Sequence, residues 1–280
     1  MYVPFSDNGG IKSFDVVIVF REVSLLEHAH RTYPDANLYF WLQTIPNKQF
    51  QRHRKNLTKF AVQIIGVSDF HRGVLEDKLK LPAPIRWLNR LSTDRPKSVT
   101  YMYNAIDEDL NPDPQIKQDI DKLVFFSSPH KGLDEVLKCF HLAREKRSTL
   151  KLYLANPGYL NLDVKTSEGI VCLGELAPKD VLRHVREAFC VFYPQTQFEE
   201  TFGCVFAEAN AVGTPVLAHP IGSAAEVLGN QEQLVDARDP KRVVDRLMHW
   251  YKNGAPKVKA NEAFRLSHVL DGWETLLSTK

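Results

Sequence analysis

The sequence contains few cysteines, and their spacing excludes a disulfide framework and a zinc site. Its four cysteines, Cys139, Cys172, Cys190 and Cys204, lie far apart and form no Cys-x-x-Cys pair. Disulfide-rich modules and zinc modules depend on such closely spaced cysteines. Most of these cysteines stand in apolar surroundings, and we therefore expect them to be small core residues in a reducing compartment.

Long apolar runs and an excess of charge are also absent. No run approaches the roughly 20 residues of a membrane-spanning helix, and the first residues lack the pattern of a signal peptide. The chain has 36 Lys and Arg residues against 34 Asp and Glu residues. This balance disfavours a dedicated nucleic-acid binder. The sequence therefore predicts a cytoplasmic globular protein without a nucleic-acid partner.

The length of 280 residues and the 44% of hydrophobic residues suffice for the cores of two domains. Short apolar runs alternate with amphipathic stretches, as in parallel α/β sheets covered by helices. We expect strands at 14–20, 38–42, 63–67, 98–103, 123–126, 151–154, 170–173, 190–193 and 215–218. We expect helices at 47–59, 69–80, 131–146, 178–188, 203–212, 240–252 and 260–278.

The composition changes between the two halves, where residues 81–114 contain five prolines. We place the domain junction there. The expected domains are a short N-terminal α/β domain over 1–115 and a second α/β domain over 116–258. Residues 259–280 are expected to form a C-terminal helix that crosses back to the first domain.

The most informative segment lies between residues 199 and 218. Glu200 and Glu208 are separated by seven residues and are followed by Gly213-Thr214-Pro215 and an apolar run. Glu200 is expected in the loop before a helix and Glu208 about two turns later, so both carboxylates can face a ligand at the helix start. Gly203 between them permits close backbone approach, and free N–H groups at a helix N-terminus suit a diphosphate.

This segment resembles the retaining glycosyltransferases of family 4, also named glycosyl transferases group 1, which have the GT-B fold. The resemblance extends to a Lys131-Gly132 step after an apolar strand, to Gly174-Glu175-Leu176 after another strand, and to Tyr193-Pro194. It also includes Asn104-Ala105-Ile106-Asp107 at the junction. It covers roughly residues 14–228 and is most specific in the C-terminal half. The implied fold has two Rossmann-like parallel-sheet domains that face a cleft.

The resemblance implies transfer of a sugar from a nucleotide-sugar donor to a glycan or glycolipid acceptor. It implies a hexosyl- or pentosyl-type enzyme that retains the anomeric configuration and needs no metal and no separate cofactor. Catalysis would be carried by Glu200, beside the donor sugar, and by Lys131, which neutralises the diphosphate. Glu208 would hold the ribose hydroxyls. The remaining expected donor-binding residues are Ser127, Ser128, Gly174, Glu175, Leu176, Thr201, Phe202, Gly203 and Cys204.

The sequence also departs from the family pattern. Phe125-Phe126-Ser127-Ser128 stands where many members have an arginine, Gln43 replaces a histidine, and little sequence precedes residue 14. These departures favour an alternative, a catalytically weak homologue that binds a nucleotide sugar or a partner protein. A third possibility is another two-domain sugar-nucleotide enzyme, such as an epimerase. The segment with Glu200 and Glu208 and the Lys131-Gly132 step argue against it.

The expected helix at 47–59 carries a row of cations on one face, Lys48, Arg52, Lys55 and Lys59. Such a face can contact anionic lipid headgroups, which would place the protein at the membrane periphery. The simpler interpretation, which we favour, is a solvated face above a buried Phe50–Leu57 stripe. The histidines show no spacing that identifies a metal site.

Overall fold

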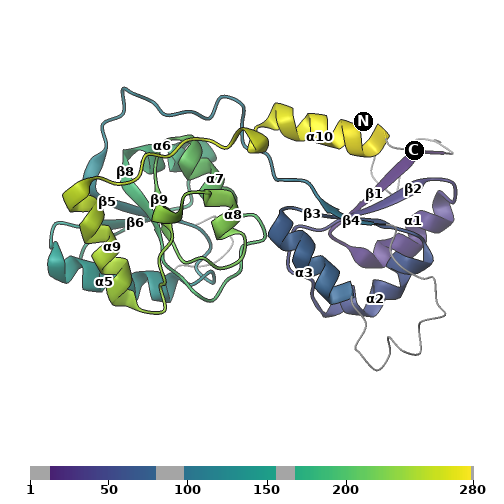
Figure 1. The fold of residues 1–280 in the computed structure, drawn as a ribbon, viewed down its shortest axis with the longest axis horizontal. Helices are drawn as coiled ribbons and strands as arrows, with labels where there is room; N and C mark the ends of the chain where they lie inside the picture. The colour runs from purple at the N-terminus through teal and green to yellow at the C-terminus, as the bar shows by residue number, and fades with distance from the viewer. Residues whose placement is uncertain (1–12, 80–97, 156–167, 279–280) are drawn as a thin grey trace. The chain divides into compact units, whose positions relative to one another are not determined.

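The computed structural model describes residues 13–79, 98–155 and 168–278. The chain divides into two compact units, Met1–Tyr103 together with Gly272–Lys280, and Asn104–Asp271. Each unit contains one parallel β-sheet with helices, which is an α/β fold with two Rossmann-like domains (Figure 1). Among the described helices, none is long and apolar enough to span a bilayer.

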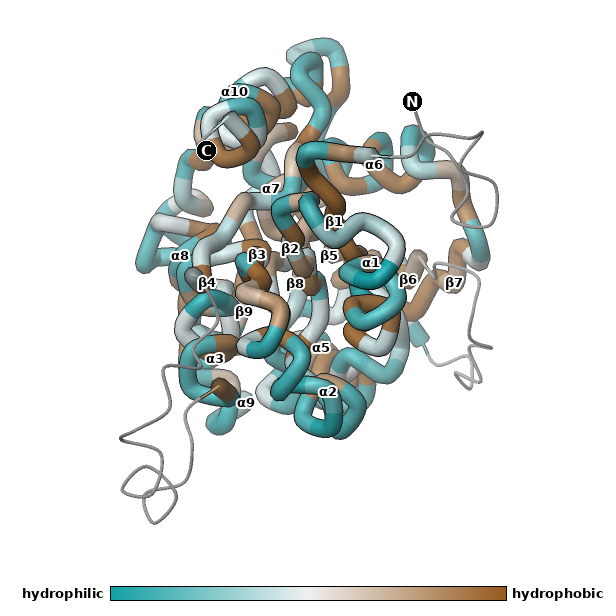
Figure 2. The backbone as a smooth tube through the Cα atoms, turned by 90° about the vertical axis from the view of Figure 1, so that its right-hand side faces the viewer, coloured by the Kyte–Doolittle hydropathy of each residue, from teal (hydrophilic) through white to brown (hydrophobic). Residues whose placement is uncertain are grey.

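The first unit has a four-stranded parallel sheet in the order β1-β2-β3-β4. Its elements are β1 (Val16–Phe20), η1 (Val23–Leu25), α1 (Leu26–Thr32), β2 (Asn37–Trp41), α2 (Lys48–Lys59), β3 (Gln63–Gly66), α3 (Asp69–Leu79) and β4 (Ser98–Tyr101). Helix α2 begins where the Asn47 side chain accepts a hydrogen bond from Phe50 N. Its tube is mostly hydrophilic (Figure 2), because only Phe50 and Leu57 are buried.

The two faces of this sheet are covered differently. One face packs against α1, α2 and α3, and its core includes Val19, Phe40 and Ile64. On the opposite face, the Trp41 ring lies 5.0 Å from the Trp273 ring. There Tyr39 Oη also donates a hydrogen bond to Leu276 O at 3.3 Å. The C-terminal part of α10 (Leu266–Ser278) therefore covers β2 from the side opposite to α1–α3.

The second unit has a five-stranded parallel sheet in the order β7-β6-β5-β8-β9. The strands are β5 (Asp119–Phe126), β6 (Lys151–Ala155), β7 (Ile170–Gly174), β8 (Ala188–Tyr193) and β9 (Val216–Ala218). Strand β8 is buried along its whole length, and β7 is an edge strand that stays partly exposed. The helices and 3-10 turns are α5 (Leu133–Lys146), α6 (Pro178–Glu187), α7 (Cys204–Ala211), α8 (Ala224–Leu228), η3 (Gln231–Gln233), α9 (Pro240–Asn253) and η4 (Glu262–Phe264).

The expected strands and helices are present within the described residues, with ends that differ by a few residues. The sequence analysis missed the helical turns of η1 and α1, where apolar residues are too few to show a period. The expected helix at 260–278 is divided, because Arg265 adopts an extended conformation between η4 and α10.

The prediction that the cysteines are core residues is wrong for two of the four. Cys139 and Cys190 are buried, but Cys172 and Cys204 are exposed. Cys172 lies on β7, which pairs with β6 alone among the described strands. Cys204 is the first residue of α7, at the edge of the sheet where the helix begins.

Candidate functional site at the carboxyl edge of the second sheet

The predicted donor-binding residues come from loops that follow parallel strands of the second unit. Ser127 and Ser128 follow β5, and Tyr193 ends the neighbouring strand β8. Parallel strands present their carboxyl ends at one edge, and open α/β sheets bind ligands beyond that edge. Ser127 and Ser128 are both buried there, and the Ser127 Oγ lies 3.5 Å from Tyr193 Oη.

An ion pair between Lys131 and Glu200 forms the centre of this edge. Lys131 Nζ donates to Glu200 Oε1 at 2.8 Å and to Oε2 at 3.1 Å. The Lys131 side chain is 23% exposed and the Glu200 side chain 9% exposed. Tyr193 Oη donates to the same Glu200 Oε1 at 2.9 Å. Burial and the Glu200 charge raise the pKa of Tyr193, which keeps this hydroxyl protonated as a donor.

Two residues that the sequence analysis did not select position the loop before Glu200. Gln195 is buried, and its Oε1 accepts from the N–H groups of Gln197 and Phe198. Its Nε2 donates to Phe198 O at 2.8 Å. Glu135 of α5 accepts from Thr196 N and Thr196 Oγ1. These contacts bring the Phe198 ring to 4.7 Å from Lys131 Nζ, where the ring face favours the ammonium.

The position of Gln195 contained a usable signal, since it is a polar residue two positions after an apolar buried strand. Its burial could not be read from the sequence, because it depends on the turn that the side chain itself organises.

A glycine of another loop packs directly on the Glu200 backbone. Gly222 has φ +63°, and a Cβ there would lie 2.6 Å from Glu200 O and 2.8 Å from Glu200 N. Ser223 N donates to Glu200 O at 2.9 Å. Gly222 is therefore required both by its backbone conformation and by its close approach to Glu200.

The turn from Glu200 into α7 contains the other expected residues of this segment. Phe202 is buried, with its ring 5.1 Å from the Phe264 ring, and Thr201 stands between Glu200 and Phe202. Gly203 has φ +77° and precedes α7 without a side-chain cap. The first N–H groups of α7 therefore have no capping side chain and suit an anion. Cys204 Sγ accepts a hydrogen bond from Asn104 Nδ2 at 3.8 Å.

Glu208 lies one turn further along α7 and has a distinct environment. Burial, and next the negative charge of Asp107, raise the pKa of Glu208 to about 7. Asp107 belongs to a segment that is held by the buried Arg265, whose Nη1 donates to the carbonyls of Asp107, Glu108 and Leu110. Glu208 is therefore a carboxyl group that changes its charge near neutral pH.

Gly174, Glu175 and Leu176 lie at the carboxyl end of β7, with Gly174 in a left-handed conformation at φ +71°. Strand β7 is separated from β5 by β6. The structure thus brings Lys131, Glu200 and Tyr193 into direct contact and leaves Gly174–Leu176 on the outer strand of the same edge.

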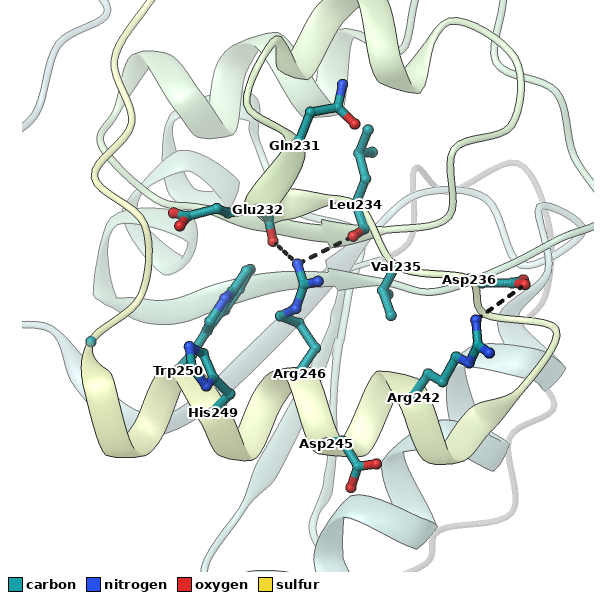
Figure 3. Close-up of a pocket in the computed structure, with 11 residues that line it drawn as sticks. Gln231, Glu232, Leu234, Val235, Asp236, Arg242, Asp245, Arg246, His249 and Trp250 are labelled. Carbon is teal, nitrogen blue, oxygen red and sulfur yellow. Dashed lines mark hydrogen bonds and ion pairs between the residues drawn. The ribbon is translucent and has the colours of Figure 1, made fainter.

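A separate pocket of this unit does not share these residues. It is lined by η3, the following loop and α9, including Arg242, Arg246 and Trp250 (Figure 3). Arg246 Nη1 already donates to Glu232 O and Leu234 O, and Arg242 lies 4.0 Å from Asp236. None of the predicted donor-binding residues lines this pocket, so it is distinct from the Lys131–Glu200 site.

The chain belongs to the family Glycosyl transferases group 1, whose sequence model matches residues 113–266. This interval contains Lys131, Glu200 and Glu208.

Two curated relatives are named D-inositol 3-phosphate glycosyltransferase. The protein from Nocardioides sp. is 40% identical over 70 residues, which are 24% of this chain and 14% of the relative. The protein from Pseudarthrobacter chlorophenolicus is 26% identical over 156 residues, which are 51% of this chain and 37% of the relative. The chain therefore matches well under half the length of these curated relatives.

Solved structures are similar over nearly the whole chain. TarM has a TM-score of 0.69 at 14% identity, covering 94% of this chain and 55% of TarM. Pneumococcal O-GlcNAc transferase GtfA, solved with UDP and GlcNAc, has a TM-score of 0.66 at 14% identity, covering 93% of this chain and 56% of GtfA. WaaG, a lipopolysaccharide-biosynthesis glycosyltransferase, has a TM-score of 0.54 at 13% identity, covering 95% and 79%. At these identities the likeness establishes the GT-B fold.

Proposed function

We propose that this protein is a glycosyltransferase that moves a sugar from a nucleotide-sugar donor to a glycan or glycoconjugate acceptor. The observation that carries the proposal is the Lys131–Glu200 pair at the carboxyl edge of the second sheet. Membership of the family supports the reaction class, and the names of the curated relatives agree with it. UDP, which is bound in the GtfA structure, is the first nucleotide to test.

The chemistry requires stabilisation of the departing nucleoside diphosphate. When the bond between the sugar and the phosphate breaks, negative charge develops on the phosphate oxygen. The Lys131 ammonium and the uncapped N–H groups of α7 can stabilise this charge more in the transition state than in the ground state. Glu200 would lie beside the donor sugar, and Glu208 would accept hydrogen bonds from the ribose hydroxyls.

The finer parts of the proposal are retention of the anomeric configuration and a transfer step without metal. Lys131 and the α7 N-terminus supply positive charge of the kind that a metal ion supplies elsewhere. We expect sugar transfer to continue in the presence of EDTA. We also expect NMR to show that the product has the same anomeric configuration as the donor. Loss of transfer in EDTA, or inversion, would contradict these parts separately.

The direct test is a thermal-shift screen of the purified chain with UDP, GDP, ADP and CMP at about 1 mM, since a ligand of the folded state raises stability. A shift with one nucleotide that is lost in Lys131→Met is expected. Release of that nucleotide from its sugar conjugate in the presence of acceptor then identifies an enzyme. Binding without release would favour the weak, nucleotide-sugar-binding homologue, and no shift would contradict the donor site.

As the alternative to the solvated face that we favour above, we also propose a test of whether α2 contacts an anionic surface, such as that of a membrane holding a glycolipid acceptor. Lys48, Arg52, Lys55 and Lys59 are exposed, and no acidic residue occurs in this helix. Sedimentation with anionic vesicles but not with neutral vesicles at low salt is expected. Equal sedimentation with both would exclude the contact.

A further inference from the structure

The two carboxylate oxygens of Glu200 have different hydrogen-bond partners. Oε1 accepts from Lys131 Nζ at 2.8 Å and from Tyr193 Oη at 2.9 Å. Oε2 accepts from Lys131 Nζ alone among the described residues, at 3.1 Å. A carboxylate oxygen has two lone pairs. Both lone pairs of Oε1 are therefore occupied, and Oε2 keeps one lone pair for a further donor.

The Tyr193 hydroxyl is fixed by the packing of its ring. Tyr193 is buried, and its ring stacks on the Phe125 ring of β5 with 5.3 Å between the centroids. The Phe206 ring of α7 meets the Tyr193 ring edge to face, also at 5.3 Å. Ser127 Oγ lies 3.5 Å from the hydroxyl. Because a side chain in a close-packed core has little freedom to move, Tyr193 presents its hydroxyl to Glu200 from a fixed position.

Lys131 and Tyr193 respond differently to a bound nucleoside diphosphate. The Lys131 side chain is 23% exposed, and its ammonium attracts the phosphate charge. On binding, the three N–H groups of the ammonium are shared between Glu200 and the phosphate oxygens, so the bonds from Lys131 to Glu200 weaken. The Tyr193 hydroxyl is neutral and buried, and it stays on Oε1. Among the described residues, Tyr193 is then the donor that continues to fix the orientation of the carboxylate.

We propose that Tyr193 is a positioning residue for sugar transfer, which binds Oε1 of Glu200 and directs Oε2 toward the donor sugar while Lys131 binds the diphosphate. This inference rests on the proposed function, in which Glu200 lies beside the donor sugar. The Glu200 backbone is fixed separately, by the close approach of Gly222 and by Ser223 N, which donates to Glu200 O at 2.9 Å. Tyr193 therefore controls the rotation of the Glu200 side chain and not the path of the backbone.

The first test is Tyr193→Phe, which removes the hydroxyl and keeps the ring. Release of UDP from its sugar conjugate in the presence of acceptor is expected to slow roughly tenfold, because Glu200 loses its fixed donor. The Kd for UDP, measured by isothermal titration calorimetry, is expected to stay within about twofold of wild type. The matched control is Tyr251→Phe. It removes a hydroxyl that donates to Ile120 O at 2.8 Å near the start of β5, from a ring stacked on Phe189, and it should leave both quantities near wild type.

A double-mutant cycle with Glu200→Gln tests whether Tyr193 acts through Glu200. In the Glu200→Gln background, Tyr193→Phe is expected to lower turnover by less than about twofold, because the carboxylate that it positions is absent. An equal loss in both backgrounds would overturn the proposal, since a general loss of packing acts independently of Glu200. Turnover of Tyr193→Phe equal to that of wild type would overturn it as well, and so would a UDP Kd that rises in proportion to the loss of turnover.

Crystal structures of wild type and Tyr193→Phe with UDP give a readout that does not depend on turnover. In wild type, Glu200 is expected to keep its contact with Tyr193 while Lys131 turns to the diphosphate. In Tyr193→Phe, the Glu200 side chain is expected to leave this orientation, and the same orientation in both structures would overturn the positioning role. A wild-type chain that binds none of the four nucleotides would overturn the proposed function together with this inference. An active wild type with any of the contrary outcomes overturns this inference alone.

Discussion

The Lys131–Glu200 ion pair imposes a condition on nucleotide binding. Both Glu200 oxygens accept from Lys131 Nζ, at 2.8 and 3.1 Å. A diphosphate that binds the ammonium must therefore share it with a carboxylate of the same charge as its own. Replacing Lys131 by Met removes the cation, whereas Glu200→Gln keeps the side-chain size and removes the competing charge. We expect these two changes to have opposite effects on the affinity for a nucleoside diphosphate.

The magnitudes follow from the charges and their exposure. A hydrogen bond to a charged group contributes about 1.5–3 kcal/mol, so Lys131→Met should raise the Kd for UDP by roughly 10- to 100-fold. Two unit charges about 4 Å apart interact with about 4 kcal/mol at an effective dielectric constant of about 20. Lys131 is 23% exposed, and water and the Tyr193 hydroxyl remain to bind the partners. We therefore expect Glu200→Gln to tighten UDP binding by only about 1 kcal/mol, or about fivefold.

Isothermal titration calorimetry with UDP measures these affinities, and release of UDP from its sugar conjugate measures turnover. Glu200→Gln is expected to lower turnover at least about a hundredfold while UDP affinity is retained or increased, which separates catalysis from binding. The matched control is Asp134→Asn, which also removes one negative charge but from an exposed side chain of α5. It should leave both the UDP affinity and the turnover near those of wild type. If Glu200→Gln weakens UDP binding as much as Lys131→Met does, the charge-competition reasoning is wrong.

Three further predictions concern separate features of the molecule. Because the pKa of Glu208 is raised to about 7, its ionised form is lost as pH falls below 7, and UDP affinity should drop about tenfold from about pH 8 to about pH 6. The Glu208→Gln variant, titrated in parallel, should lack this tenfold drop. If both proteins show the same pH profile, ionised Glu208 does not bind the nucleotide. Gly222→Ala should lower the free energy of unfolding by about 2–4 kcal/mol and remove most of the activity, because the new Cβ meets the Glu200 backbone. Gly229 has φ +64° and open space around it, so Gly229→Ala should cost only about 1 kcal/mol in urea denaturation. Equal costs for the two variants would contradict the close contact of Gly222 with Glu200. Burial lowers the pKa of His71 to about 4, so the unfolded chain binds the proton more strongly than the folded chain between about pH 4 and pH 6.5. The free energy of unfolding should therefore fall by about 2 kcal/mol from pH 7 to pH 5. His71→Asn should show a smaller fall, and an unchanged pH profile in this variant would exclude His71 as the cause.

The sequence predicted the parallel α/β architecture of both units, because buried strands have apolar runs and their covering helices have amphipathic periods. The helix at 240–252 illustrates this, since the predicted apolar residues Val243, Val244, Leu247 and Trp250 are the buried residues of α9. Short helical turns without a full apolar period, such as η1 and α8, could not be predicted in the same way.

The candidate site likewise has features that the local sequence predicts and features that depend on the tertiary structure. The spacing of Glu200, Gly203 and Glu208 along one turn and one helix is local, so the sequence by itself determined which residues lie near the start of α7. Contacts between distant segments were decided only by the tertiary structure. Lys131 meets Glu200 because β5 and β8 are neighbours in the sheet, although 69 residues separate the two side chains in sequence.

The tertiary structure also decides the electrostatic environment of Glu200 and Glu208. Glu200 and Glu208 are the same residue type, yet one is paired with Lys131 and the other has its pKa raised by burial and by Asp107. The side chain determines which charge a residue can carry, and the surrounding fold determines whether that charge is paired, buried or exposed. The sequence therefore determined the type of fold and the residues at the start of α7, and the packing of separate strands and loops decided their chemical roles.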